Sequence, residues 1–136
     1  MGLNERRAAK EFEAKRFPQF QQEIHTAVGF AVPIEVNWDS IALEGAANSY
    51  DETWAKIYFQ PLIKALQSIG ADEMGKEALK GALKKITIAN RHNHFDAGKM
   101  VSFDQGTLHL DHHPTTNAHA IDSRTKAIQK LLESKL

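Results

Sequence analysis

Apolar and polar residues alternate most regularly in the C-terminal half of the chain, on both sides of the segment Asp104-Gln105-Gly106. The apolar members of this pattern are Val101, Phe103, Leu108 and Leu110. Successive side chains of a β-strand point to opposite faces, and glycine readily adopts the positive φ of a tight turn, so the pattern predicts a β-hairpin. We expect Phe103 and Leu108 to be buried, and His109 and Asp111 to lie on the opposite face.

Similar alternation elsewhere predicts two more strands, whereas apolar residues spaced three or four positions apart predict helices. The predicted strands lie near residues 32–38, 85–91, 99–104 and 107–113. The predicted helices lie near residues 4–28, 50–69, 72–84 and 117–135. Pro61 falls inside the second of these helices, where its missing N–H is expected to bend or split the helix.

The order of these elements predicts an α+β fold. Helices separate the first strand from the other three, which follow one another along the chain. We expect an antiparallel sheet of three or four strands, in which the last three form a meander and the first joins at an edge or in the middle. Helices are expected to cover its apolar face and leave the other face open. No repeat or linker divides the sequence, so residues 1–136 are expected to form a single domain.

The composition argues against several classes of function. The 17 basic and 17 acidic residues cancel, whereas proteins that bind nucleic acid or anionic membranes usually carry excess positive charge. We therefore expect neither nucleic acid nor a membrane as a partner. The chain contains no cysteine, which excludes disulfides, thiolate metal ligands and thiol nucleophiles. No apolar run approaches the roughly 18 residues of a membrane span, and we expect a cytoplasmic protein.

Motifs of the commoner enzyme classes are absent from the sequence: it has no nucleophile elbow, phosphate-binding loop, dinucleotide-binding fingerprint or H-E-x-x-H motif. The segment His92-Asn93-His94-Phe95-Asp96 resembles the H-x-H-x-D motif of the metallo-β-lactamase superfamily. This resemblance implies that the two histidines bind one metal and the aspartate a second, within an αββα sandwich. The chain has Ala97 where that family has a further histidine, and it is short for such a sandwich.

Histidines and aspartates mark the candidate site. On a regular strand, His109, Asp111 and His113 share a face, with alternate Cα atoms about 6.8 Å apart. These three residues are the candidate metal site, for a divalent ion such as zinc, manganese or iron. The alternative is a polar face that binds no cofactor. The wider set expected to bind a ligand or partner is His92, His94, Asp96, His109, Asp111 and His113.

His112 falls on the apolar side of the predicted hairpin by the same alternation. Burial there is expected to lower its pKa. An aspartate, Asp111 or Asp96, could then orient the imidazole for acid–base catalysis without a metal.

Two segments carry charges of a single sign. Residues 35–52 contain five acidic residues and no lysine or arginine, and Lys76, Lys80 and Lys84 follow one another at helical spacing. Together with the missing catalytic motifs, this pattern favours a non-catalytic module that binds or regulates a protein partner. The alternative is a small metal-dependent or histidine-based enzyme that acts on a small molecule. The sequence indicates no particular substrate, partner or oligomeric state.

Overall fold

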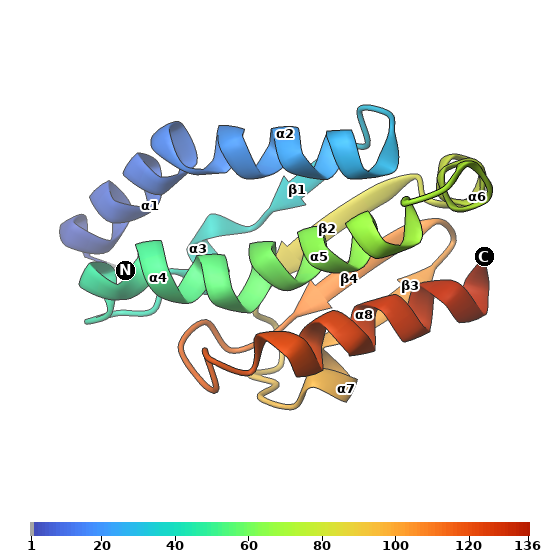
Figure 1. Cartoon of the computed structure of the whole chain (residues 1–136). Helices are drawn as coiled ribbons and strands as arrows, with labels where there is room; N and C mark the ends of the chain where they lie inside the picture. Colours follow the sequence, from blue (N-terminus) through green and yellow to red (C-terminus); the bar gives the residue numbers. More distant parts are fainter. Residues whose placement is uncertain (1) are drawn as a thin grey trace.

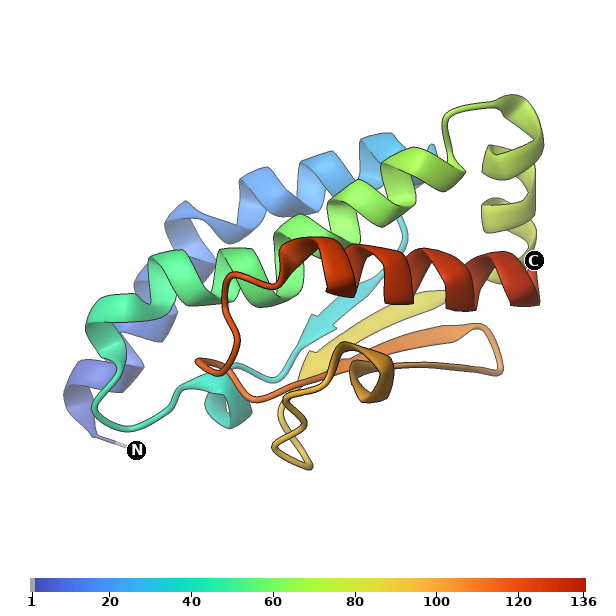
Figure 2. The same ribbon diagram turned by 60° about the horizontal axis from the view of Figure 1, so that its bottom comes forward.

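The computed structural model describes residues 2–136 and has two layers, a four-stranded sheet and a set of helices (Figure 1). The long helices α2 (Phe17–Val28), α5 (Gln60–Ile69) and α8 (Ile121–Lys135) lie side by side, with α5 in contact with both of the others. Figure 2 shows these helices on the same side of the sheet. The predicted α+β class is therefore confirmed.

The sheet is mixed, so the prediction of an antiparallel sheet is wrong. Its strands are β1 (Ile34–Val36), β2 (Lys85–Ala89), β3 (Val101–Asp104) and β4 (Thr107–Asp111), arranged in the order β1-β2-β4-β3. The pairs β1/β2 and β2/β4 are parallel, and only β3/β4 is antiparallel. The first strand lies at an edge, which is one of the two positions expected for it.

The last three strands do not form a meander because β4, and not β3, pairs with β2. After β2 the chain crosses to the far edge of the sheet and forms β3. It then turns back through the hairpin, and β4 fills the position between β2 and β3. Alternation gives a strand an apolar face whichever way its neighbour runs, so the pattern around Ile86 and Ile88 does not encode the direction of pairing. The pairing is a property of the whole fold.

The predicted hairpin is confirmed, including its register. Phe103 pairs with Leu108, and the two-residue turn of Gln105 and Gly106 has φ values of 51° and 83°. Positive φ at both positions matches the turn type that best fits the twist of a hairpin. Leu108 is fully buried, whereas Phe103 is only half-buried, because it lies on the edge strand.

The remaining helices are α1 (Leu3–Lys15), α3 (Trp38–Ile41), α4 (Tyr50–Trp54), α6 (Glu73–Ala82) and α7 (Ala97–Met100), with a 3-10 turn over Ala47–Ser49. Pro61 has the expected effect, since a π-helical turn over Ala55–Phe59 separates α4 from α5 just before it. The segment expected near 4–28 divides at Arg16, before Pro18. Helix α8 starts after the expected 117, because the turn at residues 117–120 holds Asn117 at a φ of 55°.

One hydrophobic cluster fills the space between the layers, with members from α1 through α8. Ile86, Ile88, Leu108 and Leu110 supply the covered face of the sheet and are at most 1% exposed. Their strand neighbours, among them Thr87 and His109, therefore point to the opposite, open face. No helix within residues 2–136 has the length and apolar character needed to cross a membrane.

Candidate functional site

The carboxyl ends of β2 and β4 lie side by side, since Ala89 and Asp111 are paired in the parallel register. The chain turns sharply after β2. Asn90 Nδ2 donates to Asn93 Oδ1 (2.9 Å), the Asn93 N–H donates to Asn90 Oδ1 (3.0 Å), and Asn93 has a φ of 53°. Asparagine tolerates this left-handed conformation better than most residues do. The turn places residues 92–94 beside the end of β4, where sheets with parallel strands commonly bind ligands.

His92, His94 and Asp111 form a compact cluster at this end of the sheet. Each offers one ligand atom, and these atoms all lie within 4.8 Å of one another. The His92 Nδ1–H donates to Asp111 Oδ2 at 2.5 Å, and the two imidazole rings stack with centroids 5.2 Å apart. Tetrahedral ligands about 2.1 Å from zinc are about 3.4 Å apart, so shifts of about 1 Å would bring these atoms into coordination geometry.

The surroundings of Asp111 stabilise the ionised form of its carboxylate. Partial burial raises its pKa, but the hydrogen bonds that it accepts from the Arg91 N–H and from His92 outweigh this effect and hold the pKa below its ordinary value. The Arg91 N–H lies 2.7 Å from Asp111 Oδ1. Asp111 is therefore ionised at neutral pH, in the protonation state that metal ligation requires.

His109 lies next to the cluster on the open face but is not a member of it. Its Nδ1 is 2.6 Å from the hydroxyl of Thr87, its register partner on β2. A cavity of about 200 Å³ on this face is lined by residues that include Thr87, His92, Ser102, His109 and Asp111. A small polar molecule in this cavity would touch both His109 and the cluster.

The side chains of Asp96 and His113 have contacts outside the cluster, although the His113 N–H donates to the His94 carbonyl (2.7 Å). Asp96 caps α7 by accepting the Gly98 N–H (2.7 Å), and His113 Nδ1 is 2.8 Å from the Thr116 hydroxyl. Strand β4 ends at Asp111, before the His113-Pro114 pair. The structure thus does not assemble His109, Asp111 and His113 into one site; Asp111 joins two loop histidines. A ligand role for Asp96 or His113 stays a prediction.

The H-x-H part of the resemblance to the metallo-β-lactamase superfamily has a geometric counterpart, since His92 and His94 belong to one cluster. The fold that the resemblance implies is absent from residues 2–136. A single four-stranded mixed sheet with its long helices on one side is not an αββα sandwich. The resemblance therefore ends with the local motif.

A buried polar network lies on the covered side, directly behind the cluster. His112 is 0% exposed; its Nδ1–H donates to the His113 carbonyl (2.6 Å), and Arg124 Nη2 lies 3.4 Å from its Nε2. Burial lowers the pKa of His112 to about 4, so its imidazole is neutral at pH 7. The expected burial is confirmed. However, the ring is oriented by a carbonyl and a guanidinium, and the aspartates expected to do this, Asp111 and Asp96, do not contact it.

Tyr58 anchors this network to the helical layer. Its hydroxyl donates to the His112 carbonyl at 2.5 Å, and burial raises the pKa of the phenol well above its ordinary value. Tyr58 lies in the π-helical turn of Ala55–Phe59, whose widened backbone precedes α5. Irregular turns of this kind often mark positions with a specific structural or functional task.

Reasoning from the sequence missed Arg124, which is 1% exposed. A signal for it exists, because Arg124 stands one turn before Ile128 and two turns before Leu132 on the apolar stripe of α8. A basic residue in such a stripe and in the first turn of a helix has an unusual position, since the helix dipole disfavours positive charge there.

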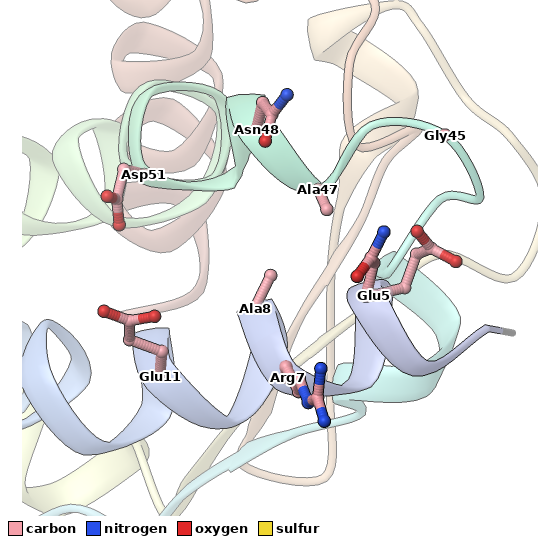
Figure 3. Close-up of a pocket in the computed structure, with 9 residues that line it drawn as sticks. Glu5, Arg7, Ala8, Glu11, Gly45, Ala47, Asn48 and Asp51 are labelled. Atoms are coloured by element: carbon pink, nitrogen blue, oxygen red, sulfur yellow. The ribbon is translucent and has the colours of Figure 1, made fainter.

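A second cavity, of about 570 Å³, lies between α1 and residues 45–51 (Figure 3). The carboxylates of Glu5, Glu11 and Asp51 line it, together with Arg7. The nearby acidic segment 35–52 is partly neutralised by ion pairs, which are Glu35–Lys85 (2.9 Å), Asp51–Arg16 (3.4 Å) and Glu52–Lys56 (2.6 Å). Helix α6, which carries Lys76 and Lys80, lies at the opposite end of the molecule from α3 and α4, whereas Glu35, at the start of the segment, lies near the end of α6 through its pair with Lys85 (Figure 1).

No protein-family model matches the chain, and no curated protein or solved structure shows significant similarity to it.

Proposed function

We propose that the chain binds a divalent metal ion through His92, His94 and Asp111 and acts as a metal-dependent enzyme on a small molecule. The observation that carries this proposal is the convergence of two imidazoles and an ionised carboxylate, with ligand atoms within 4.8 Å of one another, on the open face. Two histidines and one carboxylate suit zinc, manganese or iron(II).

The surroundings of the cluster support a catalytic role. Three protein ligands leave coordination positions for water and substrate, which is the usual arrangement of a catalytic metal site. His109, whose imidazole bonds to the Thr87 hydroxyl, lines the same cavity of about 200 Å³ as His92 and Asp111. His109 is thus the residue we assign to proton transfer, and the cavity volume fits a substrate of a few heavy atoms.

Isothermal titration of the protein with zinc, manganese(II) and iron(II) tests the site. We expect one equivalent to bind with proton release, and His94→Ala and Asp111→Asn each to weaken binding at least about tenfold. His119→Ala is the matched control, because His119 is exposed and contacts Lys56 instead of the cluster. Equal affinities for all four proteins, or no binding by any of them, would contradict the proposal.

A second candidate function is binding of a protein partner by the acidic end of the molecule, with no role for nucleic acid or a membrane. The cavity lined by Glu5, Glu11 and Asp51 favours it, because a lysine or arginine side chain of a partner could enter there. Charge reversal of Glu44 and Asp51 should abolish co-purification of such a partner and leave the fold intact. Co-purification that survives the reversal would exclude an electrostatic interaction at this end.

The chain is also proposed to work in the cytoplasm. The absence of cysteine supports this location, since small proteins of oxidising compartments commonly depend on disulfides. Fractionation of cells that express the protein tests it, and recovery from the periplasm or medium would contradict it.

A further inference from the structure

A cavity of about 340 Å³ lies apart from the metal cluster, between residues 95–97 and the first turn of α8. Phe95 and Asp96 line it from the first of these segments, and Asn117, Ser123 and Arg124 line it from the loop before α8 and its first turn. Asn117 Nδ2 donates to the Phe95 carbonyl (2.9 Å), which joins the two loops at the rim. A hydrogen bond thus connects two of the segments that line the cavity.

Arg124 carries a buried positive charge without a counterion. Its Nη2 donates to the carbonyls of Thr116 (3.1 Å) and Asn117, in the loop that precedes α8. Its Nε and Nη1 are buried and have no hydrogen-bond partner, and none of the ion pairs within residues 2–136 includes this residue. Burying an unpaired charge costs several kcal/mol, and an anion in the adjoining cavity would lower this cost.

The N-terminus of α8 adds to this positive potential. The N-cap residue is Ala120, whose side chain cannot accept a hydrogen bond from the first turn. The N–H groups of Ile121, Asp122 and Ser123 are therefore unpaired, and the helix dipole concentrates partial positive charge there. The charge of Arg124 and the partial charge of this helix end therefore both favour an anion in the cavity.

We propose that this cavity binds the carboxylate group of a small organic molecule, between the first turn of α8 and the guanidinium of Arg124. The carboxylates of Asp96, which lines the cavity, and of Asp122, in the first turn of α8, repel a dianion such as phosphate more strongly than a monoanion. Phe95 is 64% exposed at the rim and supplies an apolar surface for the rest of the ligand. The site goes beyond the metal-dependent function and does not depend on it.

Amide NMR spectra of the full chain test the proposal with three probes: sodium benzoate, inorganic phosphate and benzyl alcohol. Benzoate should shift the backbone signals of Ser123 and Arg124 in a saturable manner, and benzyl alcohol should not, because it has the ring without the charge. Phosphate should bind at least about tenfold more weakly than benzoate, as two nearby carboxylates repel it.

Two variants at Ser123 localise the effect. Aspartate is favourable in the first turn of a helix, so Ser123→Asp should fold normally while its charge weakens benzoate binding at least about tenfold. Ser123→Asn has a similar size without the charge and should retain the wild-type affinity. Arg124→Met should also lose benzoate binding, and the Ser123 pair decides the question if that variant fails to fold.

Three results would overturn the proposal. The first is the absence of saturable shifts with benzoate, and the second is equal binding of benzoate and benzyl alcohol. The third is unchanged benzoate affinity in Ser123→Asp. Tighter binding of phosphate than of benzoate would overturn the assignment to a carboxylate. Titrations in the presence of a chelator keep this outcome separate from that of the metal cluster.

Discussion

Tyr58→Phe isolates the contact that fixes the end of β4 against the helical layer. The substitution removes one hydroxyl and leaves the fully buried ring in place. That hydroxyl donates to the carbonyl of His112 at 2.5 Å, and no other donor within residues 2–136 contacts this carbonyl. The variant therefore leaves a buried carbonyl without a hydrogen bond.

The expected loss follows from this unpaired group. An unsatisfied buried acceptor costs about 1–3 kcal/mol, which for a chain of this size lowers the melting temperature by about 3–10 °C. Because His112 directly follows Asp111, we also expect the end of β4 to become less well positioned, and the affinity for metal to fall. Chemical denaturation, followed by tryptophan fluorescence, measures the first effect, and metal titration measures the second.

Tyr50→Phe is the matched control. The Tyr50 hydroxyl donates to the Leu43 carbonyl at 3.0 Å, but Leu43 is 37% exposed, so water can replace the lost donor. We expect this variant to lose less than about 1 kcal/mol and to bind metal normally. Equal losses of stability in the two variants would refute the assignment of Tyr58 as a buried anchor.

Three further predictions concern stability. Gly75→Ala should destabilise the fold by about 1–3 kcal/mol, because a Cβ there would meet a backbone oxygen at 1.7 Å. In the same denaturation assay Gly81→Ala should stabilise α6 by about 0.5–1 kcal/mol, because the space around Gly81 is open. Phe103→Ala should cost about 2–3 kcal/mol, since its ring is only half-buried, and His109→Ala under about 1 kcal/mol; the reverse order would mean that the faces of the hairpin are misassigned. With chelator present, the free energy of unfolding of the wild type should fall by up to about 3 kcal/mol between pH 6.5 and 4, because the unfolded chain takes up a proton on His112 that the folded chain does not. His112→Gln should lack this dependence of stability on pH.

The hairpin was predictable because its information is local. The alternation around Phe103 and Leu108, and a glycine at the turn, determine both the register and the buried face. The same alternation in β2 carries no information about direction, so the parallel pairing of β2 with β4 could not be derived from it. Which strand lies between its neighbours depends on the packing of the whole helical layer.

The cluster of His92, His94 and Asp111 was predictable only in part. Asp111 was expected on the open face, but a regular strand was assumed to continue to His113, whereas β4 ends two residues earlier. His92 and His94 reach Asp111 through the turn at Asn93, and such a backbone reversal follows from side-chain contacts with Asn90 that periodicity does not reveal. Positions in loops depend on these specific contacts and not on a repeating pattern.

Elemental analysis of untagged protein purified without chelator shows directly whether His92, His94 and Asp111 hold a metal ion. We expect about one equivalent of zinc, manganese or iron per chain, lost in Asp111→Asn and retained in His119→Ala. A wild-type protein that is free of metal, and whose melting temperature is unchanged by added zinc, manganese(II) or iron(II), would contradict it.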